Sequence, residues 1–251
     1  MTTRNNGRAP EPAGIRPAPA FAATGSKFYP TIAAMFVALL LISNIAATKG
    51  IQFGPIITDG GAFLFPLTYI LGDVLSEVYG LRAANKVIIT GFAAALLAAG
   101  IFQLVAISPP IAGDEWTASF GEAFALVLGV VPQILLASVS GYLFGQLLNA
   151  FVLVWIKRRF GERRLWVRLI GSTVVGEFAD TLIFCSIAAT AIGITSLSQF
   201  ANYFVVGYVY KTLLEVVLLP ITYPVIRAVK KREPSYSEAR PARTSGGADR
   251  A

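Results

Sequence analysis

Long runs of apolar residues, separated by short polar or basic stretches, dominate the chain. A helix that crosses about 30 Å of hydrocarbon needs roughly 20 mainly apolar residues. Runs of this length predict six membrane-spanning helices, at about residues 29–47, 63–80, 87–107, 131–156, 170–192 and 203–226. The pattern therefore predicts an all-α integral membrane protein with a six-span membrane domain at residues 28–232.

The two ends of the chain lack such runs. Residues 1–27 are rich in Pro, Ala and Gly, and residues 233–251 are polar with few bulky apolar groups. Neither segment can bury enough apolar surface to offset the entropy lost on ordering, so we expect two disordered cytoplasmic tails. A cleaved signal peptide is the competing interpretation of the N-terminus, although the first apolar run has the full length of a span.

Two features in the middle of the chain concern packing. A short apolar run at residues 117–131 is interpreted as a re-entrant or interfacial helix at the outer face. The fourth span carries small residues at steps of four, which places them on one helix face: Ala137, Gly141, Gly145 and Asn149. This spacing predicts close helix packing, either within one chain or between the subunits of a homodimer.

The distribution of charged residues predicts the orientation of these spans in the membrane. Only 14% of the residues are charged, against about 25% in soluble proteins, and the net charge is +7. All of the 21 basic residues except Lys49 and Lys211 fall in segments that an N-in, C-in topology places in the cytoplasm. The positive-inside rule therefore predicts that topology. Orientation and contact with anionic lipid explain the basic charge, so no nucleic-acid partner is expected.

Several kinds of chemistry are disfavoured by what the chain lacks. It contains no histidine, the commonest metal ligand and the usual general base near neutral pH. Cys185 is the single cysteine, so no disulfide can form within the chain. No GxxxxGK nucleotide-binding loop is present. We expect neither a metal nor a cofactor, and we do not expect an enzyme.

Six ionisable residues remain inside the apolar spans, where each costs about 2.5 to 3.5 kcal/mol at a helix centre. They form three pairs at a spacing of three or four residues, so each pair shares one helix face: Asp73 with Glu77, Glu177 with Asp180, and Lys211 with Glu215. Tyr208 extends the third face. Three helices are therefore expected to present polar stripes to a common interior, as in a transport pathway.

Internal neutralisation is the alternative interpretation, in which Lys211 pairs with Glu215 or Asp180. One lysine cannot neutralise five carboxylates, however, so the excess negative charge requires protons, a cation or a ligand with several donors. Carboxylates accept an amidine-like edge bidentately, and neighbouring aromatic residues such as Tyr69 can stack on a flat ring. The residues thus point to a planar, donor-rich heterocycle, and transport coupled to protons is compatible with the same acids.

Four stretches resemble the motifs of the queuosine precursor transporter family, also called the vitamin uptake transporter family. They occur in order as SNIAATKG at 43–50, GAFLFPLTYILGDVLSEVYG at 61–80, GEFADTLIF at 176–184 and YKTLLEVVLLPITYPV at 210–225. The resemblance implies a six-span protein of the bacterial inner membrane that is similar to the substrate-binding subunits of energy-coupling-factor transporters. It also implies uptake of 7-deazaguanine bases such as preQ0 and preQ1.

The resemblance reaches most of the residues singled out above, but Glu177 departs from the amide that many family members have at this position. Together, the stripes and the motifs predict a substrate-binding set of ten residues: Asn44, Tyr69, Asp73, Glu77, Glu177, Asp180, Thr181, Tyr208, Lys211 and Glu215. In the mechanism we expect, the base gives its N1 and N2 donors to the acids. Lys211 bonds the O6 carbonyl or holds Glu215.

Two alternatives to a solitary carrier remain open at the level of sequence. The chain could be a binding subunit that requires a partner ATPase, as the fold analogy suggests. It could also be an intramembrane hydrolase that uses Asp73 and Asp180 as an aspartyl pair, although the flanking Gly-x-Gly-Asp pattern of such enzymes is missing.

Overall fold

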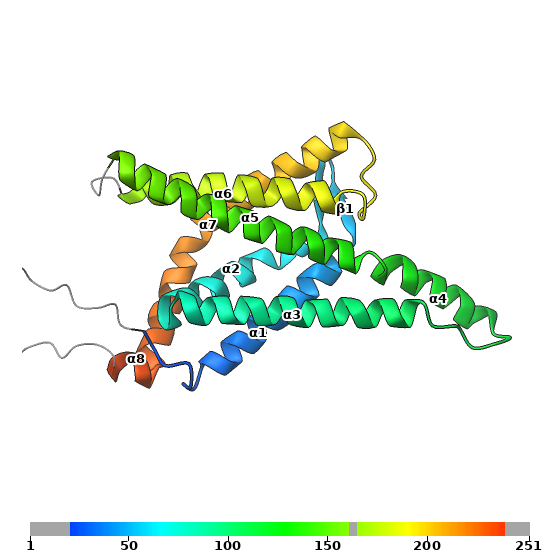
Figure 1. The fold of residues 1–251 in the computed structure, drawn as a ribbon, viewed down its shortest axis with the longest axis horizontal. Coiled ribbons are helices and arrows are strands. Elements are labelled where there is room, and N and C mark those ends of the chain that lie inside the picture. The colour runs from blue at the N-terminus through cyan, green and yellow to red at the C-terminus, as the bar shows by residue number, and fades with distance from the viewer. Residues whose placement is uncertain (1–20, 161–164, 239–251) are drawn as a thin grey trace, which may run out of the picture.

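The computed structural model describes residues 21–160 and 165–238. Figure 1 shows long helices lying lengthwise, with a small β-hairpin at one end of the bundle and the described chain ends at the other. These ends are called the hairpin end and the terminal end below. The elements are α1 (Tyr29–Ala46), β1 (Gly50–Phe53), β2 (Ile56–Asp59), the 3₁₀ turn η1 (Gly60–Phe63), α2 (Phe65–Val74), the π-helical turn η2 (Leu75–Tyr79), α3 (Leu81–Ala106), α4 (Glu115–Leu128), α5 (Val131–Phe160), α6 (Leu165–Ala188), α7 (Leu197–Arg232) and α8 (Pro234–Glu238).

Four helical stretches are long and apolar enough to cross a membrane: Tyr29–Ala46, Leu81–Ala106, Glu115–Asn149 and Gly171–Ala188. A fifth is added if the two parts of α7, which meet at an angle of 51°, form one span. Large apolar side chains such as Leu96 and Leu97 point away from the bundle, each 68% exposed, as suits contact with lipid. The protein is therefore a helical, multi-pass membrane protein, with four or five of the six expected spans recognised in the described residues.

The segment expected as one continuous span at residues 63–80 is interrupted. Its α-helix, α2, has ten residues and is followed by the five-residue π-helical turn η2. Pro66 lies in the first turn of α2, where a missing N–H is tolerated, and Gly80 ends the segment with a φ of 85°. At 1.5 Å per residue the two pieces reach at most about 22 Å, which is short of the hydrocarbon thickness.

The segment interpreted as a re-entrant or interfacial helix, residues 117–131, extends the next long helix. Most of it belongs to α4, and only Gly129 and Val130 separate α4 from α5. The Gln103 side chain donates a hydrogen bond of 3.0 Å to the carbonyl of Gly129, which ties this break to α3. In Figure 1, α4 continues beyond α5 alongside the end of α3.

The small-residue face of α5 packs against α6 of the same chain. A Cβ atom at Gly145 would lie 2.8 Å from the Cβ of Asp180, and one at Gly176 would lie 2.7 Å from the Cβ of Asn149. Both separations are shorter than real Cβ contacts allow, so the two helices approach more closely than larger residues would permit. The predicted close packing is confirmed. It is formed within one chain, so it requires no second subunit.

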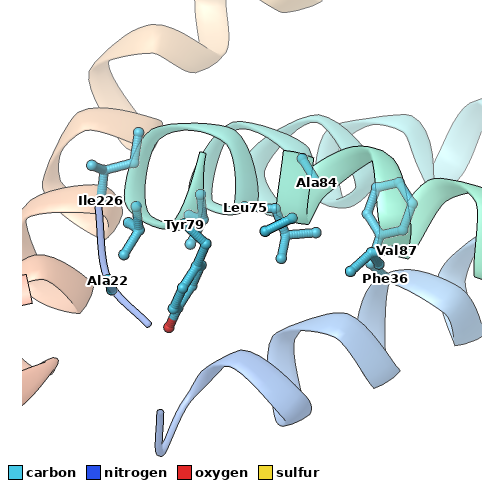
Figure 2. Packing of buried hydrophobic residues seen from close by; sticks show 10 residues of the cluster. Ala22, Phe36, Leu75, Tyr79, Ala84, Val87 and Ile226 are labelled. Carbon is cyan, nitrogen blue, oxygen red and sulfur yellow. The ribbon is translucent and has the colours of Figure 1, made fainter. Parts of the chain in front are cut away.

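A buried apolar cluster holds the terminal end of the bundle together (Figure 2). Leu75 of η2 is fully buried in it, and Phe36 of α1 and Val87 of α3 belong to the same cluster. The π-helical turn therefore fixes the end of α2 to the two neighbouring helices.

Short stretches of both expected tails make contacts at this end. The N–H of Ala22 donates to the carbonyl of Val78 at 2.8 Å, and the Tyr79 hydroxyl donates to the fully buried Glu233 at 3.0 Å. Residues 21–27 and 233–238 are therefore fixed to the membrane domain. The other residues of the predicted tails, and most of the segment interpreted as a signal peptide, lie outside the described residues.

At the hairpin end, an antiparallel hairpin lies between the first two of the expected spans. Its strands pair Gly50 with Asp59 and Phe53 with Ile56. Asn202 of α7 accepts a hydrogen bond from the Ile57 N–H at 2.8 Å and donates one to the Pro55 carbonyl at 2.7 Å. These bonds fix the hairpin to the first turns of α7.

Candidate functional site

A cavity of about 420 Å³ lies among α1, α2, α3, α5, α6 and α7. Its volume falls within the roughly 300 to 1,000 Å³ that is usual for small-molecule sites. Seven of the ten predicted site residues line it: Asn44, Tyr69, Asp73, Glu177, Asp180, Lys211 and Glu215. The structure thus brings members of all three polar pairs, from α2, α6 and α7, to a common interior.

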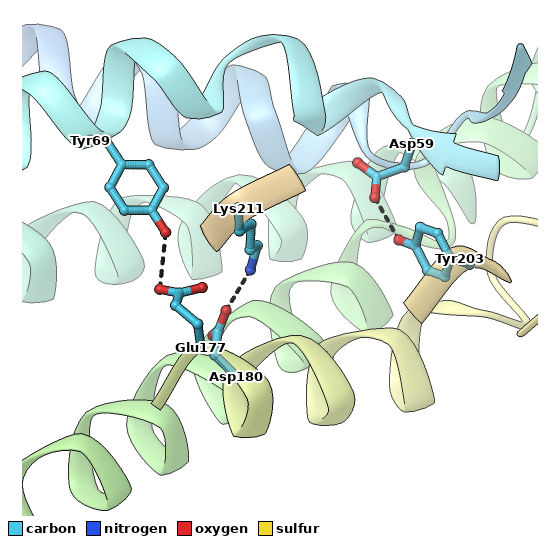
Figure 3. A network of polar contacts seen from close by, with 6 residues as sticks. All are labelled: Asp59, Tyr69, Glu177, Asp180, Tyr203 and Lys211. Carbon is cyan, nitrogen blue, oxygen red and sulfur yellow. Dashed lines mark hydrogen bonds and ion pairs between the residues drawn. The ribbon is translucent and has the colours of Figure 1, made fainter. Parts of the chain in front are cut away.

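Lys211 and Asp180 form an ion pair in the wall of this cavity (Figure 3). The Lys211 Nζ lies 2.5 Å from the Asp180 Oδ2, 4.7 Å from the ring centre of Phe65 and 5.8 Å from that of Phe184. Lys211 is 7% exposed, and a buried ammonium is costly unless a carboxylate and other favourable contacts compensate it. Of the two partners that the sequence left open for Lys211, the structure selects Asp180.

Tyr69 and Glu177 join α2 to α6 beside this ion pair, as Figure 3 shows. The Tyr69 hydroxyl donates to the Glu177 Oε1 at 2.9 Å. The other carboxylate oxygen, Glu177 Oε2, is buried and has no hydrogen-bond partner in the described part of the chain, and the same holds for the Asn149 Oδ1. Buried acceptors are nearly always hydrogen-bonded in folded proteins, so these two cavity-lining residues each have an acceptor for a ligand donor.

Asp73 of α2 and Glu215 of α7 also line the cavity. Asp73 is exposed and Glu215 is half-buried. Within residues 21–160 and 165–238, neither carboxylate forms an ion pair or a hydrogen bond. Both remain available to a positively charged group.

Asn44 lines the cavity, but its side chain is already engaged. Its Nδ2 donates to the Leu40 carbonyl at 2.9 Å, and its Oδ1 accepts from the Ser138 hydroxyl at 2.8 Å. Asn44 is 5% exposed and connects α1 to α5. Its contacts support a structural role in the cavity wall.

Glu77 was expected in the site and lies outside it. Its carboxylate pairs with Lys230 of α7 at 2.5 Å and is 59% exposed. Glu77 shares a helix face with Asp73, as its spacing predicted, but it lies one turn further towards the terminal end, past the cavity lining.

Thr181 and Tyr208 are also absent from the cavity lining. Thr181 follows Asp180 by one residue, about 100° around the helix, and is buried with its methyl group facing Gly207 of α7. The Tyr208 hydroxyl donates to the Val174 carbonyl at 3.3 Å, so this side chain joins α7 to α6. Both residues belong to the α6–α7 contact.

Asp59 is a cavity-lining acid that the sequence analysis did not single out. It ends β2, accepts from the Tyr203 hydroxyl at 2.5 Å and from the Gly61 N–H at 2.8 Å, and is 6% exposed (Figure 3). Burial raises the pKa of the Asp59 carboxyl, against the lowering effect of these two hydrogen bonds. The sequence pattern that points to this residue is an acid directly before two glycines. A Cβ atom at Gly60 would lie 2.4 Å from the Ala46 carbonyl oxygen, so the chain turns tightly against α1 here.

A bundle of long apolar helices around an acid-rich cavity of ligand size is the architecture of a membrane protein that carries a small molecule through the bundle. The sequence family described as "Putative vitamin uptake transporter" matches residues 59–225, and the chain belongs to this family of transporters. The matched segment contains every cavity carboxylate described above.

Three similar proteins are also named as transporters. The chain is 27% identical over 194 residues to the "Probable queuosine precursor transporter" of Bacillus subtilis, covering 77% of this chain and 82% of the relative. It is 28% identical over 183 residues to the "Queuosine precursor transporter" of Escherichia coli, covering 72% and 78%. A "Probable queuosine precursor transporter" of Haemophilus influenzae is 25% identical over 174 residues, covering 69% and 70%.

No solved structure matches the chain. The expected similarity to energy-coupling-factor subunits therefore stays a prediction. The relatives are transporters, which confirms that the chain is a transporter and not an enzyme, and the intramembrane hydrolase is set aside.

Proposed function

We propose that the chain imports queuosine precursors, 7-deazaguanine bases such as preQ0 and preQ1, across the cell inner membrane, and that the cavity is their binding site. The names of the relatives supply the substrate class. The volume and the polar lining of the cavity are suited to a molecule of that size and polarity.

The pair of unpartnered acceptors, Glu177 Oε2 and Asn149 Oδ1, is the observation that carries this proposal. A guanine-like base presents neighbouring N–H donors on one edge, and a carboxylate accepts such an edge through two hydrogen bonds. The bond from Tyr69 fixes the Glu177 carboxylate in place before a ligand arrives. A donor-rich ring edge would satisfy acceptors that the described protein groups leave unsatisfied.

Aromatic side chains in the cavity lining favour a flat ligand. Phe65, Phe92, Tyr142 and Phe184 line the same space as the acceptors. Stacking of a base on such a ring contributes about 1 to 3 kcal/mol, and it tolerates different substituents because it depends on the flat face of the base.

The proposal includes a route and an energy source. With both termini in the cytoplasm, the hairpin end faces outside, and the base enters the cavity from there. The prolines at the bend of α7, Pro220 and Pro224, provide a place where one half of the helix can move relative to the other. Protons are the proposed coupling ion, with the cavity acids as their carriers.

Uptake of radiolabelled preQ1 and preQ0 by cells that lack their own route tests the site. Glu177→Leu, which removes both carboxylate oxygens, should abolish uptake, and Glu177→Gln, which keeps one acceptor, should retain part of it. Glu77→Gln is the matched control, because Glu77 lies outside the cavity lining. Full uptake by correctly inserted Glu177→Leu would contradict the assignment of the site.

Proteoliposomes that contain only the purified chain separate the carrier from the alternative of a binding subunit. A solitary proton-coupled carrier should accumulate the base when a proton gradient is imposed and merely equilibrate it otherwise. Binding without any transport would instead favour a subunit that needs a partner ATPase.

A further inference from the structure

The charges that line the cavity do not balance. Five carboxyl groups face one ammonium group, that of Lys211: Asp59, Asp73, Glu177, Asp180 and Glu215. The ammonium is already bound by Asp180, the Asp59 carboxyl is held by Tyr203 and Gly61, and Glu177 accepts from Tyr69. Asp73 and Glu215 are the two acids that remain without a partner in the described part of the chain.

These two acids approach the cavity from different helices. Asp73 lies in the last turn of α2, just before the π-helical turn, and Glu215 lies one turn beyond Lys211 on α7. The helices α2 and α7 pack against each other, and both carboxylates line the same cavity. Two carboxylates that share a site repel each other unless one of them holds a proton or a cation lies between them.

A protonated amine suits this place better than a metal ion. No group of three or more Cys, Asp or Glu side chains within residues 21–160 and 165–238 is arranged to hold a metal. An ammonium group, in contrast, carries three donors and can bond both carboxylates at once. The cavity already holds one ammonium group, that of Lys211, which lies between a single carboxylate, Asp180, and the face of Phe65.

We propose that the transported base carries a protonated primary amine, which Asp73 and Glu215 bind while the ring edge is bound by Glu177 and Asn149. Independent support for a ligand in this cavity comes from the buried, unpartnered oxygens of the latter two residues. The inference rests on the proposed function and narrows it: among 7-deazaguanines, an aminomethyl base is the preferred cargo and a neutral nitrile is not.

Binding of preQ1 and preQ0 to the purified full-length chain compares the two classes directly, because the rings are the same and only the substituent differs. Wild-type protein should bind the amine at least about tenfold more tightly, since a hydrogen bond between charged groups is stronger than one between neutral groups. Asp73→Asn and Glu215→Gln should each weaken amine binding by about tenfold and change nitrile binding by less than about threefold. Glu77→Gln should change neither.

The outcomes separate this inference from the proposed function. Equal affinity of the wild type for the two bases would overturn the amine contact and leave the proposed function standing. If Asp73→Asn and Glu215→Gln weaken the binding of preQ1 and preQ0 equally, the amine contact is likewise overturned and the proposed function stands, because the two acids would then bind the ring that the bases share. Failure of the wild type to bind either base would overturn the proposed function, and the inference with it. The wild-type comparison needs no variant, so misfolding of a variant cannot hide the answer.

Discussion

Lys211 of α7 binds Asp180 of α6 across 2.5 Å, and the pair closes the wall of the cavity between those helices. Asp180 also touches the small-residue face of α5, because Gly145 leaves room for its Cβ. One ion pair therefore links the polar site to the close packing of α5 against α6.

Removing the ammonium from this pair should destabilise the protein strongly. Lys211→Met leaves Asp180 as an uncompensated charge, which typically costs about 3 to 5 kcal/mol in a buried pair. The double variant Lys211→Met/Asp180→Asn should recover much of that loss, because no charge remains unpaired. Thermal unfolding in detergent measures the effect, with the exposed Lys49→Met as control. Equal stability of Lys211→Met and wild type would contradict the role of the pair.

The bond from Tyr69 to Glu177 should matter for binding more than for folding. Tyr69→Phe removes a hydroxyl that donates to the carboxylate at 2.9 Å and keeps the ring. Without this bond the Glu177 carboxylate must be fixed in place when the base binds, so affinity for the base should fall by about tenfold, on the scale of a hydrogen bond to a charged group. Isothermal titration of the purified variant measures this change. Tyr223→Phe, on a largely exposed ring, should bind as the wild type does.

The close packing of α5 against α6 should not tolerate an added methyl group. Gly176→Ala places a Cβ 2.7 Å from the Cβ of Asn149, a contact that only a backbone shift can relieve. Overpacking of this kind costs about 1 to 3 kcal/mol. Gly100→Ala is the matched control in α3, because no atom lies within 4 Å of its Cβ position, and it should be neutral or stabilising. A melting temperature for Gly176→Ala at or above that of Gly100→Ala would refute the prediction.

Asp59 should make stability depend on pH. Because burial raises its pKa, the folded protein holds the Asp59 proton more tightly than the unfolded chain does. The resulting contribution to the free energy of unfolding is complete below the ordinary pKa of about 4 and is lost as the pH rises through the raised value. Asp59→Asn cannot lose a proton, so its melting temperature should fall less than that of the wild type between low and neutral pH. Identical slopes for the two proteins would show that Asp59 does not contribute.

The sequence by itself determined the class of protein and the polar helix faces. Apolar runs of membrane length and the concentration of basic residues outside them depend only on composition and order along the chain, so they can be read without contacts. The spacing of Glu177 and Asp180 is likewise local, because residues three or four apart share a helix face whatever surrounds the helix. The small residues of α5 are also recognised from their spacing alone, because steps of four place them on one helix face.

Only the tertiary structure decided which of these groups meet. The partner of Lys211 depends on how α6 and α7 cross, and the exclusion of Glu77 depends on where the cavity ends along α2. The two glycines after Asp59 indicate a tight turn, but they do not show that the Asp59 carboxyl is bound by Tyr203, 144 positions away. Periodicity identifies the face of a helix, but the distance between two faces is set by the packing of helices that are far apart in the chain.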